Sequence, residues 1–103
     1  MSKEGKMTQA NKENETKYKL KLFIAGNEPN SVQAVDNIKD ILDSNIKDKY
    51  KLELIDILTD FQSAIDHGVL VTPMLIIIEP SPETTIVGTM SDAEKLKAAL
   101  RLK

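Results

Sequence analysis

Residues 18–32 read YKLKLFIAGNEPNSV and decide how the chain folds. In the first half of this stretch every second residue is apolar or aromatic, as expected of a strand that buries one face. These alternating residues are Tyr18, Leu20, Leu22 and Ile24. We therefore expect a strand that ends near residue 24, with this face directed at the core.

The second half of the stretch predicts a tight turn that leads into a helix. Gly26 and Asn27 tolerate a positive φ angle, and Pro29 fixes φ at a value suited to a turn or a helix entry. Asn30 or Ser31 is expected to cap the helix by accepting a hydrogen bond from a free backbone N–H. A strand followed by a capped helix is the first half of a βαβ unit.

Length and composition narrow the class of protein. The chain has 103 residues, enough for one domain with its own core. A formal net charge of −2 gives no indication of nucleic-acid binding or of a basic membrane anchor. No apolar run reaches the roughly 18 residues of a membrane span, and the first residues do not resemble a secretory signal, so we expect a cytoplasmic protein. The absence of cysteine excludes disulfides, thiolate catalysis and cysteine-bound metals.

The remaining chain predicts a single α/β domain. Residues 1–16 are rich in Lys, Glu, Asn and Thr, which predicts a disordered tail ahead of a folded domain at 17–103. The apolar spacing from residue 32 onwards predicts a helix at about 30–44. The later elements are expected to be a strand at 50–58, a short helix at 61–67, a strand region at 70–78, a short strand at 84–87 and a helix at 93–102. The element order is therefore βαβαββα.

Several details of these elements are also predicted. The strand at 50–58 is apolar on both faces toward its end, which is typical of an interior parallel strand. Asp60 is expected to cap the short helix and Gly68 to end it, while Ser91 and Glu94 form a capping box. The apolar run 74–78 predicts burial on both faces. We expect helices to cover both faces of the sheet.

The element order matches the thioredoxin-like arrangement, a parallel βαβ unit followed by a hairpin and a closing helix. A thioredoxin enzyme carries its cysteine pair at the end of the first strand, where this chain has Asn27 to Asn30. Without a thiol no nucleophile for disulfide exchange exists, so redox catalysis is excluded. Thr72-Pro73 lies where thioredoxin-like folds carry a cis-proline, and the sequence leaves cis and trans both open at this bond.

Four motifs resemble the KaiB family of small circadian-clock proteins. They are Lys21 to Val32, Leu54 to Leu58, Leu70 to Leu75, and the proline-rich turn Glu79 to Pro82 with the later Gly88 and Ser91. The resemblance runs in order from about residue 19 to residue 102. It implies a non-enzymatic adaptor without a cofactor, which binds a KaiC-type ATPase and regulates a circadian-timing or stress-adaptation pathway. The chain is also similar to the sensor domain of the kinase SasA, which implies the alternative of a module that binds a histidine kinase without a clock role.

The resemblance further implies that the chain has two folds. One is the thioredoxin-like monomer, and the other is a ground-state βαββααβ form that assembles into dimers or tetramers. Periodicity does not say which is populated, because two packings of one chain can differ by only a few kcal/mol. The residues expected to accompany the fold switch are Pro73, Pro80, Pro82 and Gly88. Slow isomerisation of the prolines is the hypothesis for the rate of the switch.

The same resemblance predicts a partner-binding surface on the first helix and the second strand. Its candidate residues are Asn27, Pro29, Asn30, Gln33, Lys51 and Glu53. Lys51 and Glu53 stand where the family usually has Ala and Lys, and Thr84 and Thr85 stand where it has an Arg pair. The scaffold motifs are therefore present, while the usual charges for docking on the ATPase are changed.

Other polar residues have structural interpretations that outweigh catalytic ones. His67 is the only histidine and falls in the last turn of a predicted helix, where the helix dipole favours a cation. Ser31 has no base near it in sequence, which favours a capping role over a nucleophilic one. The acids are expected to be solvated or to cap helices rather than to bind Mg²⁺. These acids are Glu53, Asp56, Asp60 and Asp66. The sequence thus predicts no catalytic, metal or cofactor site.

Overall fold

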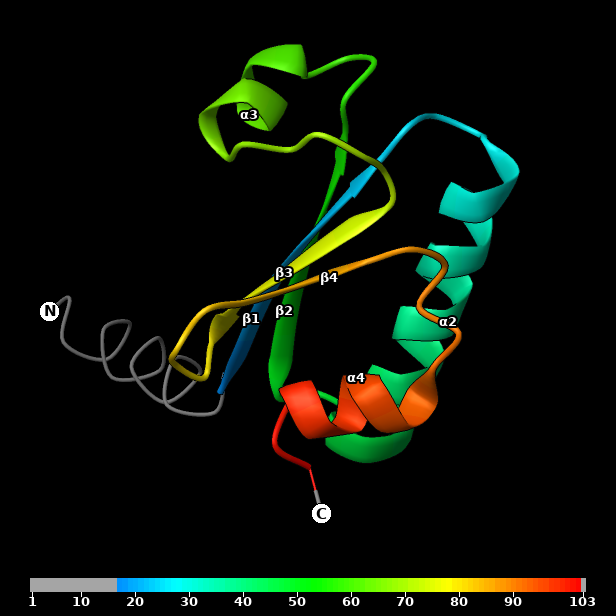
Figure 1. Cartoon of the computed structure of the whole chain (residues 1–103). Helices are drawn as coiled ribbons and strands as arrows, with labels where there is room; N and C mark the ends of the chain where they lie inside the picture. The colour runs from blue at the N-terminus through cyan, green and yellow to red at the C-terminus, as the bar shows by residue number, and fades with distance from the viewer. Residues whose placement is uncertain (1–16, 103) are drawn as a thin grey trace, which may run out of the picture.

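The computed structural model of the chain describes residues 17–102, and the tail predicted at 1–16 lies outside them. Figure 1 shows a single sheet with two helices over one face and a short helix beyond one end of the strands. The elements are β1 (Tyr18–Ile24), α2 (Pro29–Ile46), β2 (Tyr50–Asp56), α3 (Phe61–Asp66), β3 (Met74–Glu79), β4 (Thr84–Val87) and α4 (Ala93–Ala99). The predicted order βαβαββα is confirmed.

The sheet has four strands in the order β2-β1-β3-β4. β1 and β2 are parallel, with Leu22 beside Leu54, whereas β3 is antiparallel to both β1 and β4. The parallel pair is joined through α2, because parallel strands need a long crossover connection. This topology is thioredoxin-like, as the sequence predicted.

β2 lies at an edge of the sheet, so the prediction of an interior strand at 50–58 was wrong. The strand ends at Asp56, and Leu54 remains 42% exposed. The apolar pattern has another cause. Leu52 packs against the core beneath the helices, and Ile55 packs with Phe23 on the opposite face. Both faces of β2 are therefore partly covered although one edge is open.

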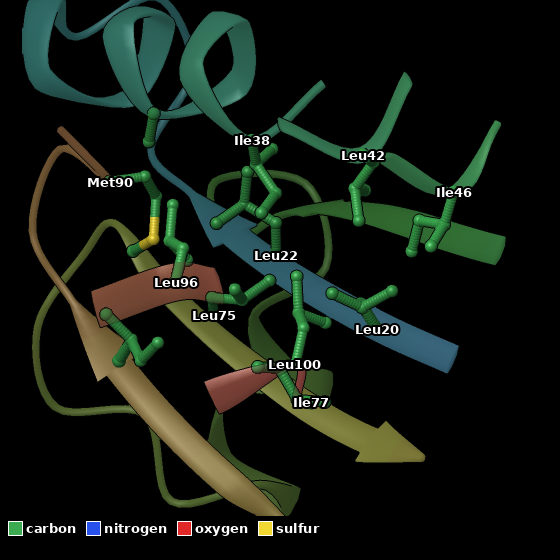
Figure 2. Close-up of a cluster of buried hydrophobic side chains, with 12 residues drawn as sticks. Leu20, Leu22, Ile38, Leu42, Ile46, Leu75, Ile77, Met90, Leu96 and Leu100 are labelled. Atoms are coloured by element: carbon green, nitrogen blue, oxygen red, sulfur yellow. The ribbon is translucent and has the colours of Figure 1, made fainter. Parts of the chain in front are cut away.

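The larger core lies between one face of the sheet and helices α2 and α4 (Figure 2). We call this face the first face. Leu20 and Leu22 point into it from β1, and both are buried. Ile38, Leu42 and Ile46 descend from α2 at four-residue intervals, which places them on one side of the helix. α4 contributes Leu96 and the following Leu100. The predicted apolar face of residues 18–24 is thus confirmed.

The opposite face, which we call the second face, is covered at one end only. Its small core consists of Phe23, Ile55 and Ile76, with Val69 from the connection after α3 packed against it. His67 at the end of α3 lies over Phe23, with ring centroids 5.2 Å apart. The expectation that helices cover both faces is therefore corrected, because α2 and α4 share the first face and α3 reaches only the end of the second.

Two helix caps differ from those predicted. α2 begins at Pro29, and Glu28 caps it by accepting a hydrogen bond from the Ser31 N–H, in place of Asn30 or Ser31. α4 is capped by Asp92, which accepts from the Lys95 N–H, and not by Ser91. In both cases a carboxylate within three positions of the predicted residue reaches the free N–H groups at the helix start. α4 also ends three residues earlier than predicted, at Ala99.

The third strand begins at Met74, directly after Pro73, which agrees with the exclusion of proline from a ladder. Residues 70–73 of the predicted strand region therefore belong to the connection. Leu75, Ile76 and Ile77 are buried, so the predicted burial on both faces is confirmed. The bond between Thr72 and Pro73 is cis, as are the bonds that precede Pro80 and Pro82.

Candidate partner-binding surface

The turn between β1 and α2 is held by a buried serine. Ser31 is fully buried in the first turn of α2, and its Oγ accepts a hydrogen bond from the Ala25 N–H over 3.0 Å. The Glu28 carboxylate accepts from both the Ser31 N–H and the Ser31 hydroxyl, at 3.0 and 3.3 Å. Ser31 therefore fastens the end of β1 to the start of α2, which is a structural role and not a nucleophilic one.

A second anchor for this turn comes from β2. Oδ1 of Asp56, the last residue of β2, accepts from the Gly26 N–H and from the Leu58 N–H, each over 3.0 Å. The same carboxylate thus fixes the turn after β1 and the turn after β2. Gly26 has φ +53°, a conformation that favours glycine.

Four of the predicted partner-binding residues lie together around this turn. Asn27, Pro29, Asn30 and Gln33 are all exposed, three at the entry to α2 and one in its first turns. Beside them is a shallow hollow of about 170 Å³ whose lining includes Ile24, Val32 and Val35. The turn therefore presents amide groups next to an apolar surface, on a backbone fixed from two sides.

The other two candidates lie elsewhere. Lys51 and Glu53 are exposed on the second face of β2, whereas α2 covers the first face. In the register with β1 they lie beside Lys19 and Lys21 respectively. The structure therefore does not join these two residues to the turn, and the predicted surface divides into two parts.

Sequence reasoning missed an exposed apolar group in the connection between β2 and β3. Leu58, Phe61 and Leu70 are 70, 68 and 91% exposed, and Ile65 and Val71 are also exposed. Leu58 lies against the turn after β1, since its Cδ1 is 3.0 Å from the position of a Cβ on Gly26. Figure 1 shows α3 and this turn at the same end of the sheet. The available signal was the high apolar content of residues 57–71, a segment too short to form a core of its own.

The candidates for the fold switch are in two places. Pro73 is buried, and its carbonyl accepts a hydrogen bond from the Gly88 N–H over 2.9 Å, so the start of β3 is tied to the end of β4. Pro80 and Pro82 lie in the turn between these strands. Gly88 has φ +106°. The four residues therefore frame the β3–β4 hairpin.

Asp60, Asp66 and the histidine have structural partners. Asp60 caps α3 by accepting from the Ser63 N–H, and Asp66 accepts from the Gln62 amide. His67 Nδ1 lies 2.8 Å from the Ser63 carbonyl, to which it donates, and its Nε2 lies 3.2 Å from Lys21 Nζ.

Among residues 17–102 no three His, Asp or Glu side chains are grouped as metal ligands. Within the same residues, none of the helices has the length and apolar character needed to cross a membrane.

The pKa of Tyr50 is clearly perturbed. The Tyr50 hydroxyl donates a hydrogen bond to Asp43 over 2.7 Å, joining the start of β2 to α2. This hydrogen bond, with lesser contributions from burial and from the negative charges of Asp43 and Asp48, raises the pKa of Tyr50 to about 12. The pair fixes α2 against the edge strand and takes no part in the turn described above.

Comparison with known proteins agrees with the resemblance in the motifs. The family model of the KaiB domain matches residues 21–102. Proteins described as circadian clock oscillator protein KaiB, from Picosynechococcus and Rippkaea orientalis, are 44 and 45% identical over 85 residues, and each alignment covers 82% of both chains. A third, from Trichodesmium erythraeum, is 44% identical with the same coverage.

Solved structures show the same fold at low sequence identity. The N-terminal domain of Synechococcus elongatus SasA matches with a TM-score of 0.66 and 24% identity, over 84% of this chain and 85% of that one. Thioredoxin from Fasciola hepatica matches with a TM-score of 0.68 and 15% identity, over 94 and 91%. These likenesses establish the thioredoxin-like fold and nothing about the chemistry of the site.

Proposed function

The chain belongs to the KaiB family, and from this premise we propose that it is a non-enzymatic adaptor that binds a KaiC-type ATPase and regulates a circadian-timing or stress-adaptation pathway. We place it in the cytoplasm with that partner. Clock oscillator proteins of this family are 44–45% identical to the chain, which supports a role of the same kind.

The observation that carries the proposal is the surface at the end of β1. The exposed amides of Asn27 and Asn30 stand on a turn held by Asp56 and Ser31, and the exposed Leu58 adjoins it. A surface that is rigid before binding loses little conformational entropy when a partner docks. Exposed apolar groups rimmed by polar ones are typical of protein–protein contact sites. These features suit docking and supply no group positioned to make or break bonds.

The test is direct binding to the purified KaiC-type ATPase of the source organism. We expect a saturable complex, and we expect the double variant Asn27→Ala, Asn30→Ala to weaken it at least tenfold, which corresponds to about 1.4 kcal/mol. Asn45→Ala is the matched control, because Asn45 is exposed at the other end of α2 and bonds only to the Ile41 carbonyl of its own helix. Absence of binding, or an equal loss in both variants, would contradict the proposal.

A second candidate function is a sensor module that binds a histidine kinase. The fold likeness to the N-terminal domain of SasA is the reason to test it. Capture of partners from the native cytosol with the tagged full chain separates the two functions, because one yields the ATPase and the other a kinase. The Asn27, Asn30 double variant serves in the same experiment as the negative control.

We also retain the proposal of a second, ground-state fold, with Pro73, Pro80, Pro82 and Gly88 in the segment that rearranges. Its support is family membership, and the thioredoxin-like form described above is the other state. Backbone NMR assignment of residues 60–100 tests it. Resonances with strand shifts outside Met74–Glu79 and Thr84–Val87 are expected, alone or beside a second set, and a single set that matches only these two strands would contradict it.

A further inference from the structure

Most of the exposed apolar side chains of the described chain lie beyond the end of the sheet where β1 and β2 finish. Of the large apolar residues exposed among 17–102, only Val32, Leu54 and Val87 lie outside the connection between β2 and β3. Figure 1 shows that this connection, which includes α3, extends past the strands at one end of the molecule. We call its exposed apolar residues the apolar end, and they are Leu58, Phe61, Ile65, Leu70 and Val71.

The apolar end has the form of a binding surface. Phe61 and Ile65 are 68 and 54% exposed and lie four positions apart, which places them on the same side of α3. A hollow of about 210 Å³ opens between Ile57, which precedes α3, and residues 69–72, which follow it. Exposed apolar groups in polar surroundings are typical of contact sites for other molecules. The helix side and the hollow therefore offer places for apolar side chains of a partner.

The charges around the apolar end are negative. Asp60 and Asp66 stand at the two ends of α3, and Glu28 stands in the neighbouring turn after β1. Each of these carboxylates accepts hydrogen bonds from neutral N–H, hydroxyl or amide groups of the helix that it belongs to or caps. These bonds leave the three negative charges uncompensated.

Positive charges lie elsewhere in the described chain. Residues 52–94, which include the whole connection, contain neither Lys nor Arg. Lys21 approaches α3 from the sheet, with its Nζ 3.2 Å from His67 Nε2, and is half-buried there. The other described Lys and Arg residues belong to α2, to α4, to the residues that follow these helices, or to the end of the sheet where β1 and β2 begin. The apolar end is therefore acidic in a chain whose net charge is only −2.

This combination of charge and apolar surface discriminates between classes of partner. An acidic surface repels both nucleic acids and the anionic cytoplasmic face of a membrane. A protein segment with apolar residues flanked by Lys or Arg suits both features, because its cations lie beside the carboxylates when its apolar side chains enter the hollow. An amphipathic helix presents residues in this arrangement, with apolar anchors at i, i+3 and i+4.

We propose that the apolar end binds a basic amphipathic helix of a partner protein. Phe61, Ile65 and Leu70 contact the apolar face of that helix. Its Lys or Arg residues lie beside Asp60 and Asp66. The proposal rests on the proposed function, because it takes this end of the sheet as the docking site. It adds the sign of the partner's charge, which the neutral amides of the adjacent turn leave open.

The test uses two designed peptides of about 18 residues, a length at which isolated helices form in water. Both carry leucines on one helix face, and the other face carries lysines in the Leu–Lys peptide and glutamates in the Leu–Glu peptide. Fluorescence anisotropy with the full chain is expected to show at least tenfold tighter binding of the Leu–Lys peptide. Amide chemical shifts are expected to change at 26–30 and 57–72. Equal affinities, or shifts centred on another surface, overturn the proposal.

A double variant tests the contribution of the carboxylates. Asp60→Asn with Asp66→Asn removes two charges and keeps a capping side chain at the start of α3, since Asn caps as well as Asp. We expect it to weaken binding of the Leu–Lys peptide about fivefold, the effect of two exposed ion pairs. Asp40→Asn with Glu83→Gln, on α2 and in the β3–β4 turn, is the control with the same change of charge. Equal effects in the two double variants overturn the proposal.

Leu70→Ser tests the apolar contact, because Leu70 is 91% exposed and its loss leaves the core intact. We expect at least fivefold weaker binding of the Leu–Lys peptide, and the amide spectrum confirms that each variant is folded. Unchanged binding overturns the proposal. Self-association of the chain, or binding to phosphatidylserine vesicles, that Leu70→Ser abolishes would identify a second copy or a lipid surface as the occupant and would also overturn it.

The peptides separate this proposal from the function on which it rests. A chain that binds the KaiC-type ATPase but does not distinguish the two peptides keeps the proposed function and overturns the inference. A chain that selects the Leu–Lys peptide but does not bind the ATPase supports the inference and overturns the proposed function.

Discussion

The Gly26 N–H donates a hydrogen bond to Asp56 Oδ1 over 3.0 Å, so the last residue of β2 holds the turn that follows β1. The two residues are 30 positions apart and meet because parallel strands end at the same edge of a sheet. The same oxygen accepts from the Leu58 N–H. One carboxylate therefore joins the two segments that form the proposed docking surface.

Replacing Asp56 with alanine should destabilise the fold and loosen this surface. The change leaves the partly buried Gly26 N–H without an acceptor, which costs about 1–3 kcal/mol in the free energy of unfolding. Urea denaturation measures this loss. Asp40→Ala, on the exposed side of α2, is the control and should stay within about 0.5 kcal/mol of the unmodified chain. Equal losses in the two variants would show that the carboxylate does not anchor the turn.

The variants Gly26→Ala and Gly68→Ala should distinguish the cost of alanine at a positive φ angle from the cost of a steric contact between the new Cβ and a neighbouring side chain. Both glycines have positive φ, +53° and +68°, so alanine costs about 1 kcal/mol at each. Only at Gly26 does the new Cβ meet a neighbour, Leu58 Cδ1 at 3.0 Å, and the exposed leucine must move. We expect a similar or slightly larger stability loss at Gly26, with weaker partner binding only there. Weakened binding by Gly68→Ala would argue against a role for the turn.

The hydroxyl of Tyr50 should lose its proton only at unusually high pH. Its ionisation breaks the hydrogen bond to Asp43 and sets two negative charges side by side, which raises the pKa to about 12 from the ordinary 10. The folded state thus holds this proton more tightly than the unfolded state. The resulting stabilisation is present below pH 10 and is lost as the pH rises through 12.

Ultraviolet absorbance of the phenolate measures this transition. The step near pH 12 should disappear in Tyr50→Phe and move toward pH 10 in Asp43→Ala. Tyr18→Phe is the control, because it keeps the Tyr50–Asp43 pair intact. A late step that survives in Tyr50→Phe would assign it to another group.

Most of the fold was predictable from local pattern. The alternation at Tyr18 to Ile24 placed a strand with one buried face, and the structure packs that face under α2. The element order followed from similar periodicities. The position of β2 in the sheet was harder to predict. The apolar end of this strand is typical of an interior strand, but it is equally typical of an edge strand whose two faces are both packed. Leu54 shows the difference, since it is apolar and yet 42% exposed at an open edge.

The predictions that were wrong concern features that depend on contacts between residues distant in sequence, or on two neighbouring residues that suit the same role about equally well. Ser91 and Asp92 are both good caps, and only the path of the chain decides that Asp92 reaches the Lys95 N–H. The grouping of Asn27 and Asn30 was visible in sequence, because they are neighbours in one turn. Their separation from Lys51 and Glu53 was not, since it depends on which face of the sheet α2 covers. Leu58 was read as part of a strand and thus as core.

The exposed apolar residues should prove unnecessary for folding. Leu58→Ser removes a side chain that is 70% exposed, so the free energy of unfolding should change by less than about 0.5 kcal/mol. Leu22→Ala, at a fully buried position, should cost about 2–5 kcal/mol because it leaves a cavity. Chemical denaturation compares the two. Binding to the KaiC-type ATPase should respond differently, with at least a tenfold loss in Leu58→Ser, because Leu58 adjoins the turn of the docking surface. Unchanged binding in that variant would remove Leu58 from the interface and leave Asn27, Pro29, Asn30 and Gln33 as the proposed contacts at this end.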